Sequence, residues 1–239
     1  MQDVNGRNVP YSQTDDNWKN YLWYDPKVKP LFRKITECLH KYEKEGSHGK
    51  SLLNAMNKLN DKIIEIVNKG EYKHKHTNEG SMHESGCWHM SIANMLAIFK
   101  IKLDGRLADP ITLLWALKEH NLGSLTGFVE HSFVDPLSLI TKDKVQLVKY
   151  RSFGAEGVGK KNKALLGLLN EIDENTCAIV NVGAHEFQSS NTDDCHYVLL
   201  PHFNEGDYCA IDTNYSHKIN LFDEYDDKIH QVSLYQCFR

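Results

Sequence analysis

The segment 87–100, CWHMSIANMLAIFK, constrains the fold of this chain more than any other. It follows a polar stretch, and its length and composition predict a helix of about 14 residues with apolar side chains almost all the way round. Such a helix has to be buried on most of its sides. We therefore expect it to lie in the core, packed against a sheet formed by the rest of the chain.

The first 75 residues are predicted to be an N-terminal tail and helical extension. Residues 1–15 are polar, which favours a loose tail. Apolar residues then recur at helical spacing over 31–44 and 51–70, which predicts two amphipathic helices joined by a short loop. A polar stretch over 71–86, read as a loop, leads into the main domain, predicted to span 76–239.

After the helix at 87–100, the hydrophobic period changes from helical to alternating. Asp109 and Pro110 are typical of an N-cap and a first helical residue, and a further helix is predicted over 160–174. Short apolar or alternating runs predict strands over 145–150, 177–183, 195–203, 207–213 and 230–238. With a hairpin turn at 205–207, this order predicts an α+β fold in which an antiparallel meander packs on the helix at 87–100.

Charge and composition exclude several classes of function. The 239 residues carry a net charge of −4, so a chain-wide basic surface for nucleic acid is absent. No run of 18 apolar residues occurs, and the N-terminus lacks the pattern of a Sec signal peptide. We expect a cytoplasmic protein with free thiols, or an effector exported into a host cell without a Sec signal.

The acidic charge is concentrated at the C-terminal end. Residues 170–239 carry 3 Lys and Arg against 13 Asp and Glu, a net charge of −10. A solvated acidic surface is one interpretation. Attraction of a basic segment of a partner or substrate is the other.

Cys87 is the first residue that suggests chemistry. It lies where the polar loop meets the predicted buried helix, so unpaired backbone N–H groups and the positive end of the helix dipole surround its sulfur. Both favour a thiolate over a thiol. The alternative interpretation is a small buried residue at a helix start.

His196 and Asp212 are the candidate partners of this sulfur. His196 opens one predicted strand and Asp212 ends the next, and the short turn between them predicts that the two residues lie near each other across the ladder. A base held by a carboxylate beside a thiol forms a coherent nucleophilic set. The sequence thus predicts Cys87 as nucleophile, His196 as general base and acid, and Asp212 as the residue that orients the imidazole.

These residues stand in motifs that resemble a known superfamily. Residues 85–91, SGCWHMS, resemble the nucleophile motif of papain-like cysteine proteases. The strand HYVLL at 196–200, the turn GDY at 206–208 and Ile211-Asp212 resemble the His and Asp strands of the peptidase C39-like branch. The resemblance covers residues 80–239 and implies a papain-like fold, a cysteine protease or isopeptidase acting through a thioester, a protein or peptide substrate, and no metal or organic cofactor.

One residue that the resemblance implies is missing. The superfamily carries a Gln several residues before the nucleophile, where its amide completes the oxyanion hole, and residues 78–85 contain none. Asn78 or Ser81 is the predicted substitute, together with the backbone N–H of Cys87. Losing one such donor costs about 10²–10³ in rate.

Three alternatives remain open. The cluster of His74, His76, His83, Cys87 and His89 could bind zinc, although its spacing matches no zinc module. The same triad could serve a deamidase, a transglutaminase or another acyltransferase. The chain could also be a binding module with weak catalysis.

Overall fold

The structure is a computed structural model. It describes residues 10–19, 34, 58, 59, 62, 86–119, 136–154, 156–183, 196–201, 208–214 and 217–238. The predicted helices over 31–44 and 51–70 and the loop over 71–85 lie almost entirely outside these residues, and so does the predicted hairpin turn at 205–207. The division at residue 75 stays a prediction.

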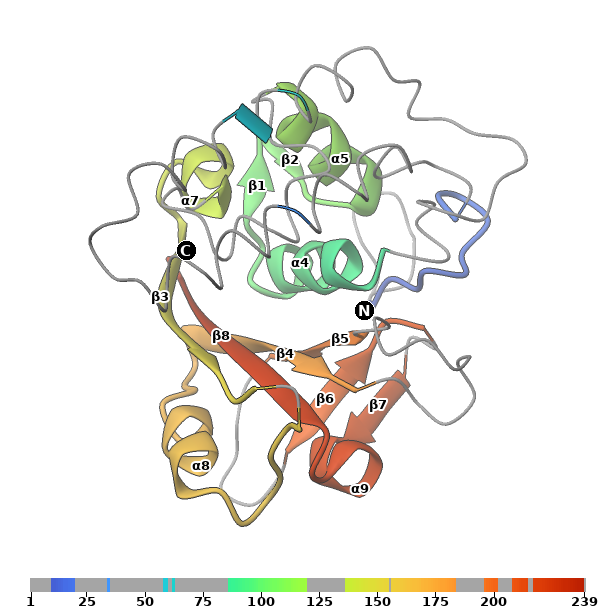
Figure 1. The fold of residues 1–239 in the computed structure, drawn as a ribbon. Coiled ribbons are helices and arrows are strands. Elements are labelled where there is room, and N and C mark those ends of the chain that lie inside the picture. The colour runs from blue at the N-terminus through green and yellow to red at the C-terminus, as the bar shows by residue number, and fades with distance from the viewer. Residues whose placement is uncertain are drawn as a thin grey trace.

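The described chain is an α+β fold in which helices lie on both faces of a sheet (Figure 1). The helices are α4 (Cys87–Ile98), α5 (Pro110–Glu119), α7 (Pro136–Thr141), α8 (Lys163–Leu169) and α9 (Leu221–Tyr225). The strands are β1 (Lys102–Leu103), β2 (Arg106–Leu107), β3 (Val145–Ser152), β4 (Thr176–Val182), β5 (His196–Leu200), β6 (Cys209–Asp212), β7 (His217–Asn220) and β8 (Ile229–Cys237).

The main sheet has six strands in the order β3-β8-β4-β5-β6-β7, and every pairing is antiparallel. The predicted meander is correct from β4 to β6, and β7 follows as a strand that was not predicted. It is wrong for the last strand, since β8 returns to lie between β3 and β4. Tyr235 and Leu234 of β8 are buried in the cores on opposite faces of the sheet, so this strand needs cover on both faces and takes a central place.

Two apolar cores are separated by the sheet. The odd-numbered Cys177 and Ile179 of β4 pack in the core that contains α4. The even-numbered Ala178, Val180 and Val182 pack in the core that contains α8 and α9. Because side chains alternate along a strand, the odd-numbered residues of β4 face α4 and the even-numbered residues face α8 and α9.

The structure can be compared with the sequence at the N-terminal ends of two predicted helices, α5 and α8. Asp109 accepts a hydrogen bond from the backbone N–H of Thr112 at 2.7 Å, which confirms it as the cap of α5. The helix predicted over 160–174 is shorter, since it begins at Lys163. The Asn162 side chain caps that end by accepting from the backbone N–H groups of Ala164 and Leu165.

The prediction of a loose tail is wrong for residues 10–15. Tyr11 and Trp18 are fully buried in the core of α4, and their rings meet edge to face. We call residues 10–19 the strap, since they run from α4 to the end of β6 (Figure 1). Two buried aromatic side chains remove enough apolar surface from water to hold this segment in place.

Among the described residues, no helix combines the length and the apolar character that a membrane crossing requires.

Candidate functional site

Cys87 is the first residue of α4 and is half-buried. Gly86 precedes it as the N-cap and makes no side-chain capping hydrogen bond. The Cys87 sulfur therefore lies at the positive end of the α4 dipole.

His196 and Asp212 meet at the same end of the sheet, as predicted from the hairpin. Asp212 lies opposite Val198 in the β5–β6 ladder, two residues from His196. The Nε2 atom of His196 is 2.9 Å from Oδ1 of Asp212, and both side chains are buried. The pair is therefore held by strand register and shielded from water.

The His196 ring also interacts electrostatically with the Cys87 side chain. Because Nε2 is bonded to Asp212, Nδ1 is the ring nitrogen that remains for another partner. Burial by itself lowers the pKa of His196, but the hydrogen bonds and charges of Asp212 and Cys87 outweigh it and raise this pKa to about 10. The imidazolium is therefore the stable form of His196 at neutral pH.

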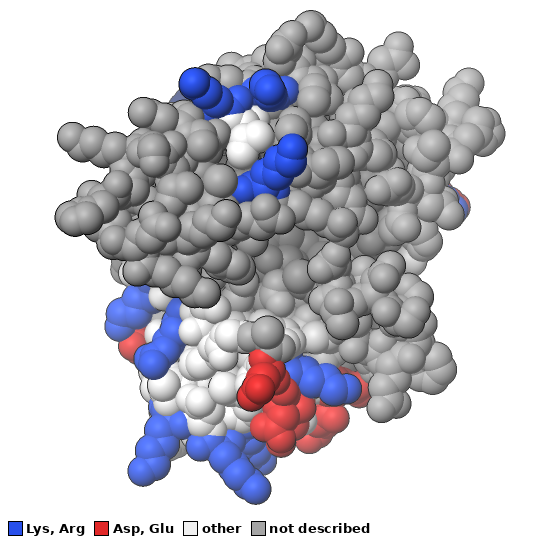
Figure 2. Space-filling view, in the orientation of Figure 1, with Lys and Arg blue, Asp and Glu red and all other residues white. Residues whose placement is uncertain are grey.

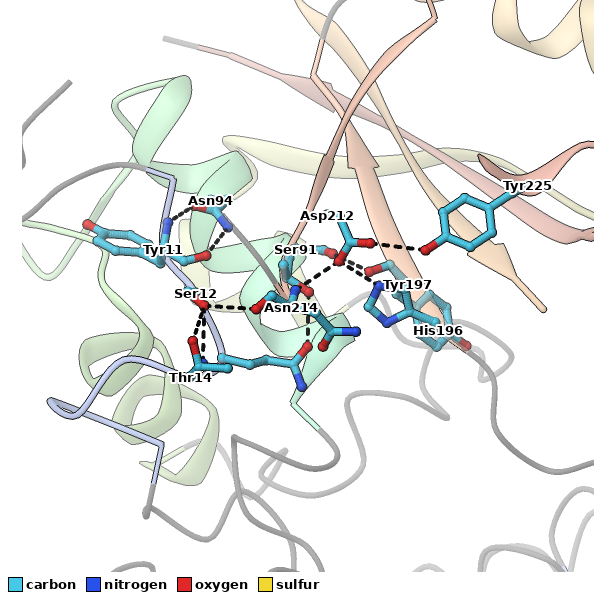
Figure 3. Close-up of polar contacts among 12 residues, drawn as sticks. Tyr11, Ser12, Thr14, Ser91, Asn94, His196, Tyr197, Asp212, Asn214 and Tyr225 are labelled. Atoms are coloured by element: carbon cyan, nitrogen blue, oxygen red, sulfur yellow. Dashed lines mark hydrogen bonds and ion pairs between the residues drawn. The ribbon is translucent and has the colours of Figure 1, made fainter. Parts of the chain in front are cut away.

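Asp212 is fixed by three donors. Its Oδ1 accepts from His196 Nε2 and from the backbone N–H of Asn214 at 2.9 Å, and its Oδ2 accepts from Tyr225 Oη at 3.0 Å. Burial by itself raises the pKa of Asp212, but the hydrogen bond and charge of His196, then the bonds from Asn214 and Tyr225, lower it overall. The carboxylate is thus ionised and held in one orientation (Figure 3).

The three residues come from opposite sides of the sheet. His196 shares its strand face with Val198, and Asp212 shares its face with Ala210, both in the core of α8 and α9. Cys87 belongs to α4, which packs on the other face. The site therefore forms at the end of the sheet, where the two layers meet.

Polar contacts fix α4 against β5 at this end. Ser91, one turn after Cys87, donates to the backbone carbonyl of Tyr197 at 3.3 Å, so α4 is held next to His196. Asn94, on the same helix face, accepts from the backbone N–H of Tyr11 at 2.5 Å and donates to its carbonyl at 3.0 Å (Figure 3). These bonds link α4 to the strap as well as to the sheet.

The strap brings a glutamine to the end of β6. Gln13 is 2% exposed, and its backbone N–H donates to the carbonyl of Thr213 at 2.9 Å. Its Oε1 accepts from the Thr213 hydroxyl at 3.1 Å. The carbonyl end of the Gln13 side chain is therefore held at the end of β6.

Asn78 and Ser81, the predicted oxyanion donors, lie outside the described residues. Reasoning from sequence missed Tyr225 and Gln13. The spacing of Leu221, Phe222 and Tyr225 is a one-turn helical pattern that could have indicated α9. Gln13 lay in a segment interpreted as a tail, although Tyr11 and Trp18 beside it are residues that favour burial.

Of the predicted zinc ligands, His74, His76 and His83 also lie outside the described part. His89 is fully buried, and its Nε2 donates to the carbonyl of Pro110 at 2.8 Å. Burial lowers the pKa of His89 to about 4, against the opposing effects of Pro110 and Asp109. Within the described ranges, no three His, Cys, Asp or Glu side chains converge to hold a metal ion.

Comparison with protein-family models, with curated proteins and with solved structures finds no significant match to this chain.

Proposed function

We propose that this protein is a papain-like thiol hydrolase, a cysteine protease or isopeptidase that acts through a thioester on Cys87. The buried His196–Asp212 pair, whose imidazole interacts electrostatically with Cys87, is the observation that carries the proposal. A half-exposed thiol at a helix start, a buried imidazole and a buried carboxylate form a nucleophile, a base and an orienting group.

In the first step the thiolate of Cys87 attacks the carbonyl carbon of a peptide or isopeptide bond, and the carbonyl oxygen becomes an oxyanion. His196 then gives its Nδ1 proton to the leaving nitrogen as the C–N bond breaks. The amine departs, and a thioester links the acyl group to Cys87. Asp212 holds the ring so that Nδ1, not Nε2, faces the reaction.

In the second step His196 acts as a base. The thiolate charge is consumed in the thioester, so one of the causes that raise the pKa of His196 is gone. Its neutral Nδ1 takes a proton from water, and the resulting hydroxide attacks the thioester. The C–S bond breaks, the acid is released and the thiolate–imidazolium pair is restored.

The backbone N–H of Cys87 is one donor for the oxyanion. We assign the second donor to the amide of Gln13. Its burial, and the anchoring of its carbonyl end by Thr213, support this assignment, because a preorganised donor needs both. Asn78 and Ser81 stay as the donors predicted from sequence.

A basic segment in the substrate is supported by the charge around α9. Asp223, Glu224, Asp226 and Asp227 are exposed on α9 and the turn after it, and Tyr225 of the same helix contacts Asp212. Figure 2 shows acidic side chains gathered on the lower layer in this region. Turnover of a basic peptide should fall as salt is raised, and an unchanged rate would remove this part of the proposal.

The test of the proposal is the reactivity of Cys87 relative to Cys209. Both cysteines are half-buried, so Cys209 is a matched internal control for access. With limiting iodoacetamide between pH 4 and 9 and peptide mapping, Cys87 should react faster than Cys209 below pH 7. His196→Ala should abolish that difference. If the wild type labels the two cysteines at equal rates, the thiol is not activated and a binding module replaces the hydrolase.

A further inference from the structure

A groove lies between β3 and α8, in the layer that contains α8 and α9. It has a volume of about 520 Å³, and it is lined by Lys149 and Arg151 of β3 and by Ala164, Gly167, Leu168 and Glu171 of α8 and the turn after it. Most of these residues are exposed, so the groove is open to solvent. We call it the β3–α8 groove. In the sheet order β3 is four strands away from β6, so the groove is separate from the proposed active site.

The strand wall of the β3–α8 groove carries positive charge. Lys149 and Arg151 are two residues apart on β3, so their side chains lie on the same face of the sheet. Their ladder partners, Leu234 and Val232, pack in the core of α8 and α9, which identifies that face as the one toward α8. Lys149 forms an ion pair with Glu171, whereas among the described residues no Asp or Glu side chain pairs with Arg151. Arg151 is therefore the charge in this groove that is available to an anionic ligand.

An aromatic ring orients the Arg151 side chain. The guanidinium carbon lies over the Phe153 ring, 5.5 Å from its centroid. A guanidinium that stacks on a ring keeps its N–H donors at its own edge, where two of them match the two oxygens of a carboxylate. Lys160, Lys161 and Lys163, before and at the start of α8, are also exposed. Figure 2 shows Lys and Arg side chains gathered on the lower layer at the side where Figure 1 places β3 and α8.

Gly167, the fifth residue of α8, is an independent indication of a ligand. A Cβ atom added at this position would meet no heavy atom within 4 Å among the described residues, so packing does not require a glycine there. Inside a helix, glycine is less favourable than alanine, because it loses more conformational entropy on folding. A glycine at such a place permits close approach to the backbone. Since Gly167 lines the groove, we expect the ligand to contact α8 at this residue.

We propose that the β3–α8 groove binds an acidic peptide segment of a partner protein. A carboxylate of the segment binds Arg151, and a neighbouring apolar side chain packs over Ala164, Gly167 and Leu168. An open groove suits an extended chain better than a small molecule, since pockets for small molecules enclose most of their ligand. The proposal does not depend on the proposed hydrolase.

The charges around the groove favour a peptide over a nucleic acid. Glu171 lies in the groove, and the exposed Asp173 and Glu174 follow it in the chain. These carboxylates repel the successive phosphates of a nucleic acid strand. A peptide places one or two carboxylates near Arg151 and leaves the rest of the groove to uncharged groups.

Binding is tested by fluorescence anisotropy with the full chain and two fluorescein-labelled peptides, Glu-Glu-Leu-Glu-Glu and the matched neutral Gln-Gln-Leu-Gln-Gln. The acidic peptide should bind at least about 10-fold more tightly than the neutral one, and its affinity should fall as salt is raised. Equal affinities for the two peptides, or no binding of the acidic peptide at millimolar concentration, overturn the proposal.

Three variants locate the binding. Gly167→Met fills the groove without changing its charge, so the affinity for the acidic peptide should fall at least about 10-fold, while the melting temperature stays the same or rises because methionine favours a helix more than glycine does. Arg151→Gln should cause a similar loss of affinity. Lys161→Gln, which removes the same charge outside the groove lining, is the control and should stay within about 2-fold of the wild type. Affinity that survives both Gly167→Met and Arg151→Gln overturns the proposal.

Two further outcomes would assign the groove to another occupant and would also overturn the proposal. One is tighter binding of an oligouridine strand than of the acidic peptide, lost in Gly167→Met, which would indicate nucleic acid. The other is self-association of the protein in sedimentation, lost in the same variant, which would indicate a second copy of this chain. Failure of Cys87 to react faster than Cys209 would contradict the hydrolase alone, and the peptide titration would still decide on the groove.

Discussion

Tyr225 donates its phenolic hydrogen to Oδ2 of Asp212 at 3.0 Å, while the other carboxylate oxygen accepts from His196. The two oxygens are thus assigned to two different partners, and rotation of the carboxylate would break both bonds. Tyr225 is fully buried at the end of α9, so its position is fixed by the core on the far side of the sheet from α4. The orientation of the proposed base therefore depends on α9. This helix is distant from Cys87 in the sequence and packs on the other face of the sheet.

Tyr225→Phe should weaken this arrangement while keeping the ring. Loss of a hydrogen bond to a charged group costs about 1.5–3 kcal/mol, so we expect kcat/KM to fall roughly 10-fold or more. The pKa of Asp212 should also rise, because Tyr225 contributes to lowering it, and the acid limb of the pH–rate profile should move to higher pH. A profile that keeps its position and only loses amplitude would contradict the positioning role.

His89 should make the protein sensitive to mild acid. Its pKa in the folded state is about 4, below the ordinary value of 6.5, so its contribution to stability is present above pH 6.5 and is lost as pH falls toward 4. The shift corresponds to about 3 kcal/mol. Urea unfolding of the wild type and of His89→Gln should give curves of stability against pH that converge over this range, and parallel curves would exclude His89 as the cause.

The contribution of His196 to the free energy of unfolding should decrease as the pH rises, whereas that of His89 decreases as the pH falls. Its folded-state pKa is raised to about 10, so its stabilising contribution is present below pH 6.5 and is lost as pH rises toward 10. In urea unfolding, the wild type should lose its advantage over His196→Gln between these two values. An advantage that grows across this range would show that the neutral ring is the stable form.

The proposed role of Gln13 can be tested with variants that distinguish the amide donor of its side chain from the carbonyl acceptor. Gln13→Glu keeps an acceptor for the Thr213 hydroxyl but removes the amide donor, and Gln13→Met removes both. If the donor serves the oxyanion, both variants should lose about 10²–10³ in kcat. Their iodoacetamide reactivity at Cys87 should match the wild type, since alkylation forms no oxyanion. Wild-type kcat in Gln13→Glu would return the role to Asn78 or Ser81.

The strap should contribute to stability through Asn94. Asn94→Ala removes both bonds to the backbone of Tyr11 and leaves that buried backbone unpaired, which should cost about 2–4 kcal/mol of unfolding free energy. Ser12→Ala, which removes a part-buried contact to Asn214 and two exposed contacts to Thr14, is the control and should cost less than about 1 kcal/mol. Equal losses in urea unfolding would show that Asn94 has no special part in docking the strap.

Local patterns predicted the elements around the site well. The apolar run after Cys87 identified α4, and the alternation around His196 and Asp212 identified β5 and β6 as neighbours. These features depend on residues close in sequence, so hydrophobic period and turn chemistry suffice to find them.

The remaining features depend on contacts that are distant in sequence. Pairing of β8 with β3 and β4 brings together residues separated by tens of positions, and no local pattern specifies which strand returns to the centre of the sheet. The strap is a similar case, since Tyr11 meets Asn94 only because α4 offers an amide at the right place. Tyr225 was missed for this reason too: its spacing indicates a short helix, but the partner of its hydroxyl is set by the tertiary fold.

Cys87 and His196 belong to layers on opposite faces of the sheet, so the geometry of the site depends on how these two layers pack against each other. Because the two residues come from different layers, a displacement of α4 against β5 by about one hydrogen-bond length would separate the sulfur from the imidazole. The hydrogen bond from Ser91 to the Tyr197 carbonyl and the contact between Asn94 and Tyr11 oppose such a displacement of α4. We therefore expect the reactivity of Cys87 to fall when the packing of α4 on β5 is weakened.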